Sequence, residues 1–177
     1  MNSQELKNVQ APLKQRYREE PDAAVVTLRA SGRLDAPGVS CRVETGRALV
    51  EAGLHPATGG TGLQACSGDM LLEALAACAG VTLRAVATAL EIPVHGGTVV
   101  VEGDLDFRGT LGVNKEAPVG FREIRLSLNL DSGATQEQLD TLLKLTERYC
   151  VVLQTLKSAP PVTASLRLAP HSPAPTP

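Results

Sequence analysis

The sequence predicts an α+β fold in which antiparallel sheets pack around one long, buried central helix. Three observations predict it. Residues 67–93 are a nearly uninterrupted run of apolar residues that favour a helix. Segments that are β-branched or alternate between apolar and polar residues flank this run on both sides. Strands and helices do not alternate regularly along the chain, so a doubly wound sheet is not expected.

The composition limits the range of functions. A chain of 177 residues, 43% hydrophobic and 20% charged, is long enough to bury the core of one domain. Only 2% of the residues are aromatic, which argues against binding of single-stranded nucleic acid. A formal net charge of −2 gives no attraction to phosphate backbones or anionic lipids. We therefore expect neither a nucleic acid nor a membrane as partner.

The chain divides into three parts. Residues 1–20 form a polar N-terminal extension, residues 21–169 a single domain, and residues 170–177 a Pro-rich tail that is predicted to be disordered. The first twenty residues lack the apolar stretch of a secretory signal. We therefore expect a cytoplasmic protein, whose thiols are kept reduced.

Short strands are predicted before the central helix. Residues 23–32 are β-branched and end at a glycine, and residues 38–46 alternate with the period of a half-buried strand. A third short strand is predicted over 47–53. Proline and glycine residues make 54–62 a loop.

The central helix is predicted to begin with Ser67 as its N-cap and Asp69 in its first turn, and to end at Pro93. Its length also fits a membrane span. Asp69, Glu73 and Arg84 interrupt the apolar run, however, which favours the core helix of a soluble protein. A helix that is apolar nearly all round needs cover on every side, and one small sheet covers only one. The sequence therefore predicts a homodimer.

The second half of the chain supplies the remaining elements. Residues 96–109 and 120–131 are predicted to be an antiparallel pair of strands. A helix follows within 132–150, with Thr135 as its N-cap and Gln138 completing a capping box. A helical pattern restarts at Cys150 over 149–159, and residues 160–169 are predicted to form a last strand.

Four cysteines, Cys41, Cys66, Cys78 and Cys150, hold most of the possible chemistry. They lack C-x-x-C spacing and the chain has only three histidines, so neither a zinc site nor a cofactor is expected. Cys78 and Cys150 lie in helical segments among small apolar residues. They are either inert buried side chains or a redox pair. In a redox pair, one thiol needs a lowered pKa and the other must condense with its sulfenic acid.

The other candidates are weaker. Cys66 directly precedes the central helix, where the helix dipole favours a thiolate, but an unreactive loop cysteine is the favoured interpretation. Cys41 lies on the apolar side of a strand and is expected in the core. The Gly-rich stretch over 59–69 lacks a phosphate-binding motif, and the scattered histidines give little support to a hydrolase triad.

Two motifs, "DMLLEALAACAGVTL" and "ERYCVVLQTL", followed by a short terminal strand, resemble the OsmC/Ohr family of thiol-dependent peroxidases. The resemblance extends over about residues 23–168. It implies an OsmC-like fold and an intertwined homodimer with the active site at the subunit interface. It also implies that Cys78 is the peroxidatic cysteine and Cys150 the resolving cysteine. The expected substrate is a small apolar organic hydroperoxide, and the expected reductant is a dithiol.

In this family an arginine from the N-terminal strands stabilises the thiolate, and an acidic residue at the start of the central helix orients that arginine. The resemblance assigns the first role to Arg33, with Arg42 and Arg47 as alternatives, and the second to Asp69, because the family's usual "NPEE" or "NPEQ" is "SGDM" here. This departure indicates a divergent subgroup, in which Cys66 is an alternative resolving thiol or the substrate differs. The alternative functions are a stress-response domain with inert thiols and a disulfide reductase or thiol transferase.

Overall fold

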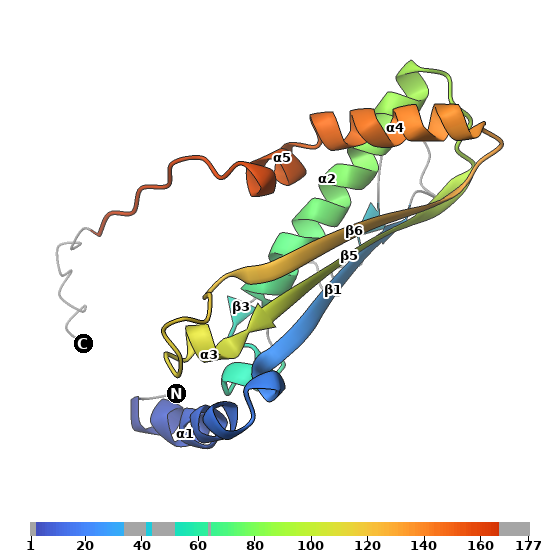
Figure 1. Ribbon diagram of the computed structural model, residues 1–177. Coiled ribbons are helices and arrows are strands. Elements are labelled where there is room, and N and C mark those ends of the chain that lie inside the picture. Colours follow the sequence, from blue (N-terminus) through green and yellow to red (C-terminus); the bar gives the residue numbers. More distant parts are fainter. Residues whose placement is uncertain (1–2, 34–41, 44–51, 64, 167–177) are drawn as a thin grey trace, which may run out of the picture.

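A four-stranded antiparallel sheet and one long helix lying across it form the body of the protein (Figure 1). The computed structural model describes residues 3–33, 42–43, 52–63 and 65–166. The strand order is β2-β1-β5-β6. The strands are β1 (Val25–Arg33), β2 (Arg42–Val43), β5 (Gly96–Asp106) and β6 (Phe121–Asp131). The α+β class with an antiparallel sheet and a long central helix is confirmed.

The predicted strands are found where the structure describes them. β1 corresponds to the strand predicted over 23–32, and β5 and β6 form the predicted antiparallel pair, with a register shift between Asp104 and Leu105. Of the strands predicted over 38–46 and 47–53, only residues 42–43 and 52–53 are described, and both are strand; Cys41 lies outside the described residues. The short strands β3 (Ala52–Gly53) and β4 (Ala65–Cys66) pair in parallel, so not every strand pair is antiparallel.

The central helix α2 (Ser67–Ala89) is buried along one face. Its N-cap is Cys66, one residue before the predicted Ser67, and Asp69 lies in the first turn as predicted. The buried face packs on β1 and β5 and is made of leucine, alanine and glycine: Leu72, Leu75, Ala76, Ala79, Gly80, Leu83 and Ala87. The opposite face leaves apolar residues about 40% exposed, among them Met70, Leu71 and Val81, which are 39%, 38% and 40% exposed. Within this single chain, the prediction of a buried helix therefore holds for one face.

Among the described helices, α2 alone is long and apolar enough to cross a membrane. Its most apolar window is 44% buried, and the buried residues belong to the main core of the protein. This is the packing of a core helix. The helix ends at Ala89, four residues before Pro93, and the chain turns through Glu91 in the left-handed conformation (φ 53°).

Helices α4 (Gln136–Tyr149) and α5 (Val151–Lys157) follow the sheet and pack against α2. The predicted capping box is present. The Thr135 hydroxyl accepts a hydrogen bond from the backbone N–H of Gln138, and the Gln138 side chain accepts one from the N–H of Thr135. The helical restart at Cys150 is also confirmed, because Cys150 is the N-cap of α5.

The strand predicted over 160–169 does not form in the part that is described. Residues 160–166 extend away from the body without pairing (Figure 1), and Val162 and Leu166 are 86% and 88% exposed. Pro160 and Pro161 have no N–H to donate, and no described strand lies beside this segment. The last residues of that predicted strand and the predicted disordered tail lie outside the described residues.

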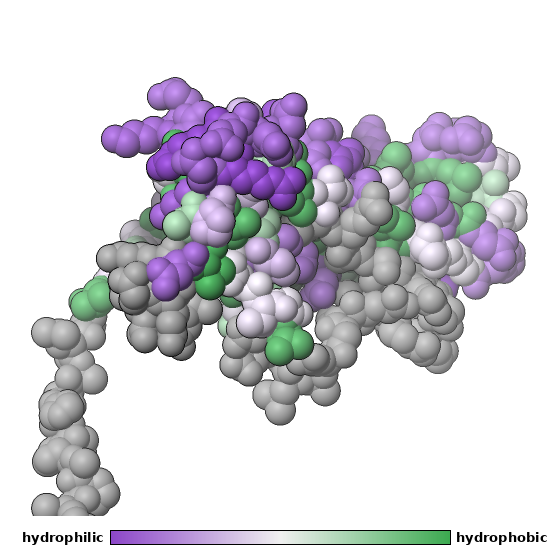
Figure 2. Space-filling model, turned by 90° about the horizontal axis from the view of Figure 1, so that it is seen from below, coloured by the Kyte–Doolittle hydropathy of each residue, from purple (hydrophilic) through white to green (hydrophobic). Residues whose placement is uncertain are grey.

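The N-terminal segment forms a helix, α1 (Ser3–Glu19), which is joined to β1 by the 3-10 helix η1 (Pro21–Ala24). It packs against η2 (Pro56–Thr58) and α3 (Phe107–Thr110). Tyr17, 3% exposed, joins a small second core with Ala24 and Phe107. The outer surface of α1 is strongly hydrophilic (Figure 2). The polar extension is therefore a helix anchored by one aromatic ring.

The left-handed residue after α2 predicts a stabilising substitution. This conformation destabilises the folded state by about 1–2 kcal/mol for a residue other than glycine. Replacing that residue by glycine removes this strain but costs about 0.5–1 kcal/mol, because glycine loses more conformational entropy on folding. We expect Glu91→Gly to raise the free energy of unfolding by about 0.5–1 kcal/mol in urea denaturation. Glu91→Ala keeps the strain and should give no such gain. A Glu91→Gly protein no more stable than Glu91→Ala would contradict the prediction.

Candidate active site

Two cysteines that are far apart in the sequence meet inside the protein. Cys78 lies near the middle of α2, and Cys150 lies at the junction of α4 and α5. Cys150 is fully buried, and its backbone N–H donates to the carbonyl of Thr146 over 2.9 Å. Because α4 and α5 both pack on α2, their junction places the Cys150 thiol within hydrogen-bonding distance of the Cys78 sulfur.

The surroundings of the two thiols act on their pKa values in opposite directions. Burial alone would raise the pKa of Cys78. Hydrogen bonds to its sulfur outweigh burial and lower that pKa; they come from the backbone N–H of Val152, the Cys150 thiol, the Thr82 hydroxyl and the backbone N–H of Val151. Burial raises the pKa of Cys150 to about 11, and the hydrogen bond that its thiol donates to Cys78 acts in the same direction. The proton therefore stays on Cys150.

This arrangement pairs a nucleophile with a protonated thiol. Thiolates rather than thiols attack electrophilic oxygen or sulfur, and Cys78 is the cysteine whose surroundings favour the thiolate. A sulfenic acid on Cys78 would have Cys150 beside it to condense with. The structure thus brings together the two cysteines that the sequence analysis paired, and their catalytic roles stay a prediction.

The predicted arginine is only partly described. Arg33 is the last residue of β1, where its backbone pairs with Thr98 on β5 and with Arg42 on β2. The side chains of Arg33 and Arg42, and all of Arg47, lie outside the described residues. Stabilisation of the thiolate by one of these arginines therefore stays a prediction.

Asp69 lies away from the thiol pair. It precedes Cys78 by about two and a half turns of α2, which is about 13 Å along the helix axis. Burial raises the pKa of Asp69, partly offset by His55, and burial together with the charge of Asp69 raises the pKa of Glu73. Burial lowers the pKa of His55, partly offset by Asp69. Among the described residues the opposite charge that acts on Asp69 is that of His55, and the role of Asp69 beside an arginine stays a prediction.

Cys66 is too distant from Cys78 to resolve it within one chain. As the N-cap of α2 it lies more than three turns from Cys78, about 18 Å along the axis. A disulfide needs Cα atoms within about 7 Å. Cys66 and Cys78 of one chain therefore cannot form a disulfide, and the suggestion that Cys66 is an alternative resolving thiol stays a prediction for the dimer. Cys66 instead lines a separate cavity of about 400 Å³ together with His55.

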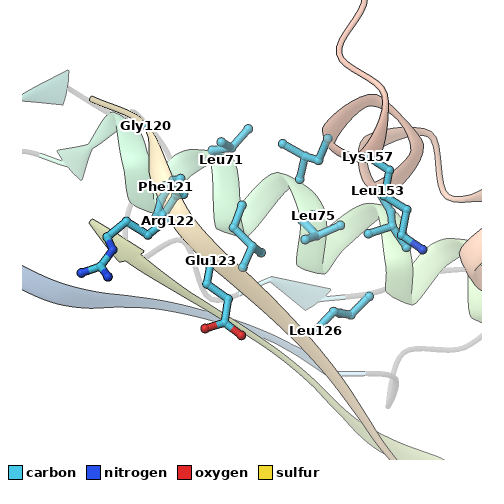
Figure 3. Close-up of a pocket in the computed structure, with 11 residues that line it drawn as sticks. Leu71, Leu75, Gly120, Phe121, Arg122, Glu123, Leu126, Leu153 and Lys157 are labelled. Carbon is cyan, nitrogen blue, oxygen red and sulfur yellow. The ribbon is translucent and has the colours of Figure 1, made fainter. Parts of the chain in front are cut away.

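A larger cavity lies along α2 (Figure 3). It measures about 500 Å³ and lies between α2, β6 and α5. Its wall includes Leu75, which is one turn before Cys78, and Leu153, whose backbone N–H hydrogen-bonds to the Cys150 sulfur. The walls are mostly apolar, as Leu71, Phe121 and Leu126 show in the close-up. An apolar molecule bound here would contact Leu75 and Leu153, which are neighbours of the two cysteines.

Sequence reasoning missed several of these groups. Thr82 follows Cys78 by one helical turn, so its hydroxyl could have been placed beside the thiol from spacing alone. The N–H groups of Val151 and Val152 are the free donors at the start of a helix, which the predicted restart at Cys150 implied. His55 had no comparable signal, because its neighbours come from α2 and α3.

A long helix on an antiparallel sheet, with one thiol at its middle and a second at a helical junction, defines an OsmC-like protein. The family model described as OsmC-like protein matches residues 60–165, more than half of the chain, and the chain belongs to this family. The resemblance noted in the sequence is thereby confirmed.

A solved structure gives the same fold. The chain is similar to an OsmC-like hydroperoxide resistance protein from Jannaschia sp. CCS1, with a TM-score of 0.59 and 18% sequence identity. The match covers 84% of this chain and 97% of the other. At this identity the likeness establishes the fold alone. A search among curated proteins finds no match.

The hydrogen bond from Thr82 predicts how Cys78 titrates. Thr82→Val removes the hydroxyl at nearly constant volume, so the pKa of Cys78 should rise. A hydrogen bond to a charged group contributes about 1.5–3 kcal/mol, so at pH 7 we expect alkylation of Cys78 by iodoacetamide to slow by roughly ten- to a hundredfold. The measurement is the pH profile of alkylation, followed by mass spectrometry of the Cys78 peptide.

Thr88→Val is the matched control, since the exposed Thr88 hydroxyl donates only to the Arg84 carbonyl on the same helix. Its alkylation profile should match that of the wild type. An unchanged midpoint in Thr82→Val would show that the hydroxyl does not stabilise the thiolate.

Proposed function

We propose that the protein is a thiol-dependent peroxidase that reduces organic hydroperoxides, with Cys78 as the nucleophile and Cys150 as the resolving thiol. The observation that carries this proposal is the hydrogen-bonded pair of thiols with opposite pKa shifts. Membership of the OsmC-like family and similarity to a protein named for hydroperoxide resistance support it. The apolar cavity along α2 favours an apolar peroxide over hydrogen peroxide.

The chemistry proceeds in three balanced steps. The Cys78 thiolate attacks the terminal oxygen of R–O–O–H; an S–O bond forms, the O–O bond breaks, and the alkoxide takes a proton and leaves as an alcohol. The Cys150 sulfur then attacks the sulfenic acid, forming a disulfide and releasing the hydroxyl, with the thiol's proton, as water. A dithiol reductant supplies two electrons and two protons to restore both thiols.

The remaining parts of the proposal concern groups outside the described contacts. We assign to Arg33, or to Arg42 or Arg47 in its place, the stabilisation of the thiolate and of the leaving oxygen, and to Asp69 the orientation of that arginine. We place the protein in the cytoplasm, as a homodimer. The exposed apolar face of α2 and the exposed apolar residues Val162 and Leu166 support the dimer, since surfaces of this kind are typical of subunit contacts.

The roles of the two cysteines predict different outcomes for their substitution. With cumene hydroperoxide and dithiothreitol, Cys78→Ser should lower turnover by at least about a thousandfold, since it removes the nucleophile. In the absence of dithiothreitol, Cys150→Ser should consume one equivalent of peroxide and then accumulate a sulfenic acid that dimedone traps on Cys78. Cys66→Ser is the control and should react like the wild type.

Two results would contradict this proposal. One is wild-type turnover by Cys78→Ser. The other is a protein that reduces a small disulfide substrate faster than cumene hydroperoxide, which would make it a disulfide reductase or thiol transferase instead.

The proposed dimer predicts that a charge on the exposed face of α2 separates the subunits. Val81→Glu should shift sedimentation equilibrium from dimer towards monomer, because a buried unpaired carboxylate is strongly unfavourable. Val119→Glu is the control, since Val119 is 68% exposed on the loop before β6. A wild-type protein that sediments as a monomer would refute the dimer.

A further inference from the structure

One buried hydroxyl near the thiol pair has no hydrogen-bond partner. Thr146, in α4, is fully buried (0% exposed), and its Oγ1 neither donates nor accepts a hydrogen bond within the described part of the chain. A buried hydroxyl without a partner is unfavourable, because it has lost its hydrogen bonds to water and has not replaced them. Valine has nearly the same shape and would fill this position without that penalty. The hydroxyl of Thr146 therefore destabilises the reduced protein, in which the thiols of Cys78 and Cys150 are free.

Other helical threonines of this protein find a partner on their own helix. The hydroxyls of Thr88, Thr141 and Thr155 each donate to the carbonyl four residues earlier, over 2.8–2.9 Å. This bond is common for a threonine within an α-helix. The corresponding acceptor for Thr146 is the carbonyl of Leu142, and the hydroxyl does not bond to it. Thr146 thus keeps its donor unused, although an acceptor is available one turn away.

Thr146 faces α2 close to the thiol pair. Leu142, Thr146 and Cys150 follow one another at intervals of four residues, and each is at most 1% exposed. They therefore lie on one buried face, which packs on α2. At one end of this face the Cys150 thiol hydrogen-bonds to Cys78, and at the other Leu142 and Leu83 line the same small cavity of about 210 Å³. Thr146 lies between these contacts and faces the stretch of α2 between Cys78 and Leu83.

The thiolate does not use this hydroxyl. The hydrogen bonds to the Cys78 sulfur come from the Cys150 thiol, the Thr82 hydroxyl and two backbone N–H groups. Backbone N–H groups also donate to the Cys150 sulfur, and Thr146 bonds to neither sulfur. An acceptor has to enter this space before the Thr146 hydroxyl can donate. In the proposed reaction, such an acceptor is the oxygen that the peroxide leaves on Cys78.

The resolving step benefits from a donor at that oxygen. The Cys150 sulfur attacks the Cys78 sulfur, so that an S–S bond forms and the S–O bond breaks. The oxygen leaves as water, with its own hydrogen and the proton of the Cys150 thiol. Negative charge develops on the oxygen as the S–O bond breaks, and a donor that is already in place stabilises this charge.

We propose that the Thr146 hydroxyl donates a hydrogen bond to the oxygen of the Cys78 sulfenic acid and so speeds formation of the disulfide with Cys150. This inference rests on the peroxidase function proposed above, and it adds a catalytic residue to the second step. Because the hydroxyl does not contact the Cys78 sulfur before oxidation, it takes no part in the attack on the peroxide. Its unpaired burial in the reduced protein keeps the donor ready for the oxygen.

The test measures how the sulfenic acid divides between two products. Reduced protein receives one equivalent of cumene hydroperoxide and a fixed excess of dimedone, without dithiothreitol. Mass spectrometry then gives the ratio of the dimedone adduct on Cys78 to the Cys78–Cys150 disulfide. For Thr146→Val, which removes the hydroxyl at nearly constant shape, this ratio should rise about five- to tenfold, the effect of one hydrogen bond. The rate of peroxide consumption should stay unchanged.

Two further variants identify the hydroxyl as the cause. Thr146→Ser keeps the hydroxyl and should restore most of the wild-type ratio. Thr141→Val is the matched control, since the exposed Thr141 hydroxyl on the same helix donates only to the Glu137 carbonyl. Its ratio should equal that of the wild type. A ratio that rises as much in Thr141→Val, or that Thr146→Ser fails to restore, would overturn the inference.

Urea denaturation of the reduced proteins gives a readout that does not depend on the reaction. Thr146→Val should unfold at a higher urea concentration than the wild type, because it removes an unpaired polar group from the core. A residue that only supports the fold would give the opposite result. A less stable Thr146→Val would show that the hydroxyl is already bonded in the reduced protein, which also overturns the inference.

The outcomes separate this inference from the peroxidase proposal. If the wild type consumes peroxide and forms the disulfide, but Thr146→Val gives the wild-type ratio, only the role of Thr146 fails. If the wild type consumes no peroxide, the peroxidase proposal fails and the role of Thr146 fails with it.

Discussion

The close packing of α2 on the sheet is the constraint on which the rest of the structure depends. Small residues make this packing possible: Ala76 and Ala79 are fully buried, and Gly80 is buried beside them. Because these side chains add little bulk, the sheet lies against one side of the helix and α4 and α5 against another. That arrangement places the α4–α5 junction over the middle of α2, where Cys78 lies. Without it, two cysteines so distant in sequence would not meet.

The same junction supplies everything in the described structure that lowers the pKa of Cys78, except for Thr82. Cys150 and the N–H groups of Val151 and Val152 are consecutive along the chain, and all of them donate to the Cys78 sulfur. A charge removed from water needs such donors, since burial by itself favours the neutral thiol. The segment that resolves the proposed sulfenic acid is thus also the segment that stabilises the thiolate. Activation and resolution depend on one short stretch of backbone.

Local patterns explain which parts of this fold could be predicted from sequence. The strands β5 and β6, the capping box at Thr135 and the extent of α2 follow from periodicity and cap chemistry within a few residues. Local patterns could not predict whether residues 160–169 form a strand, because a strand also needs a neighbouring strand to pair with. In the site, the resemblance paired Cys78 with Cys150, but the donors around them depend on how helices pack. His55 lies in a loop whose sequence gives no indication of its neighbours.

The departure of this chain from its family at the start of α2 has a structural consequence. Where the family usually has "NPEE" or "NPEQ", this chain has "SGDM", and both Ser67 and Gly68 line the second cavity. Asparagine and proline, which the family motif has in place of Ser67 and Gly68, are bulkier and would take up part of that space. The small residues leave the start of α2 open, and Asp69 follows them at a position where the family motif also carries an acid. The change in this motif thus leaves more room at the start of α2, in the cavity that His55 lines.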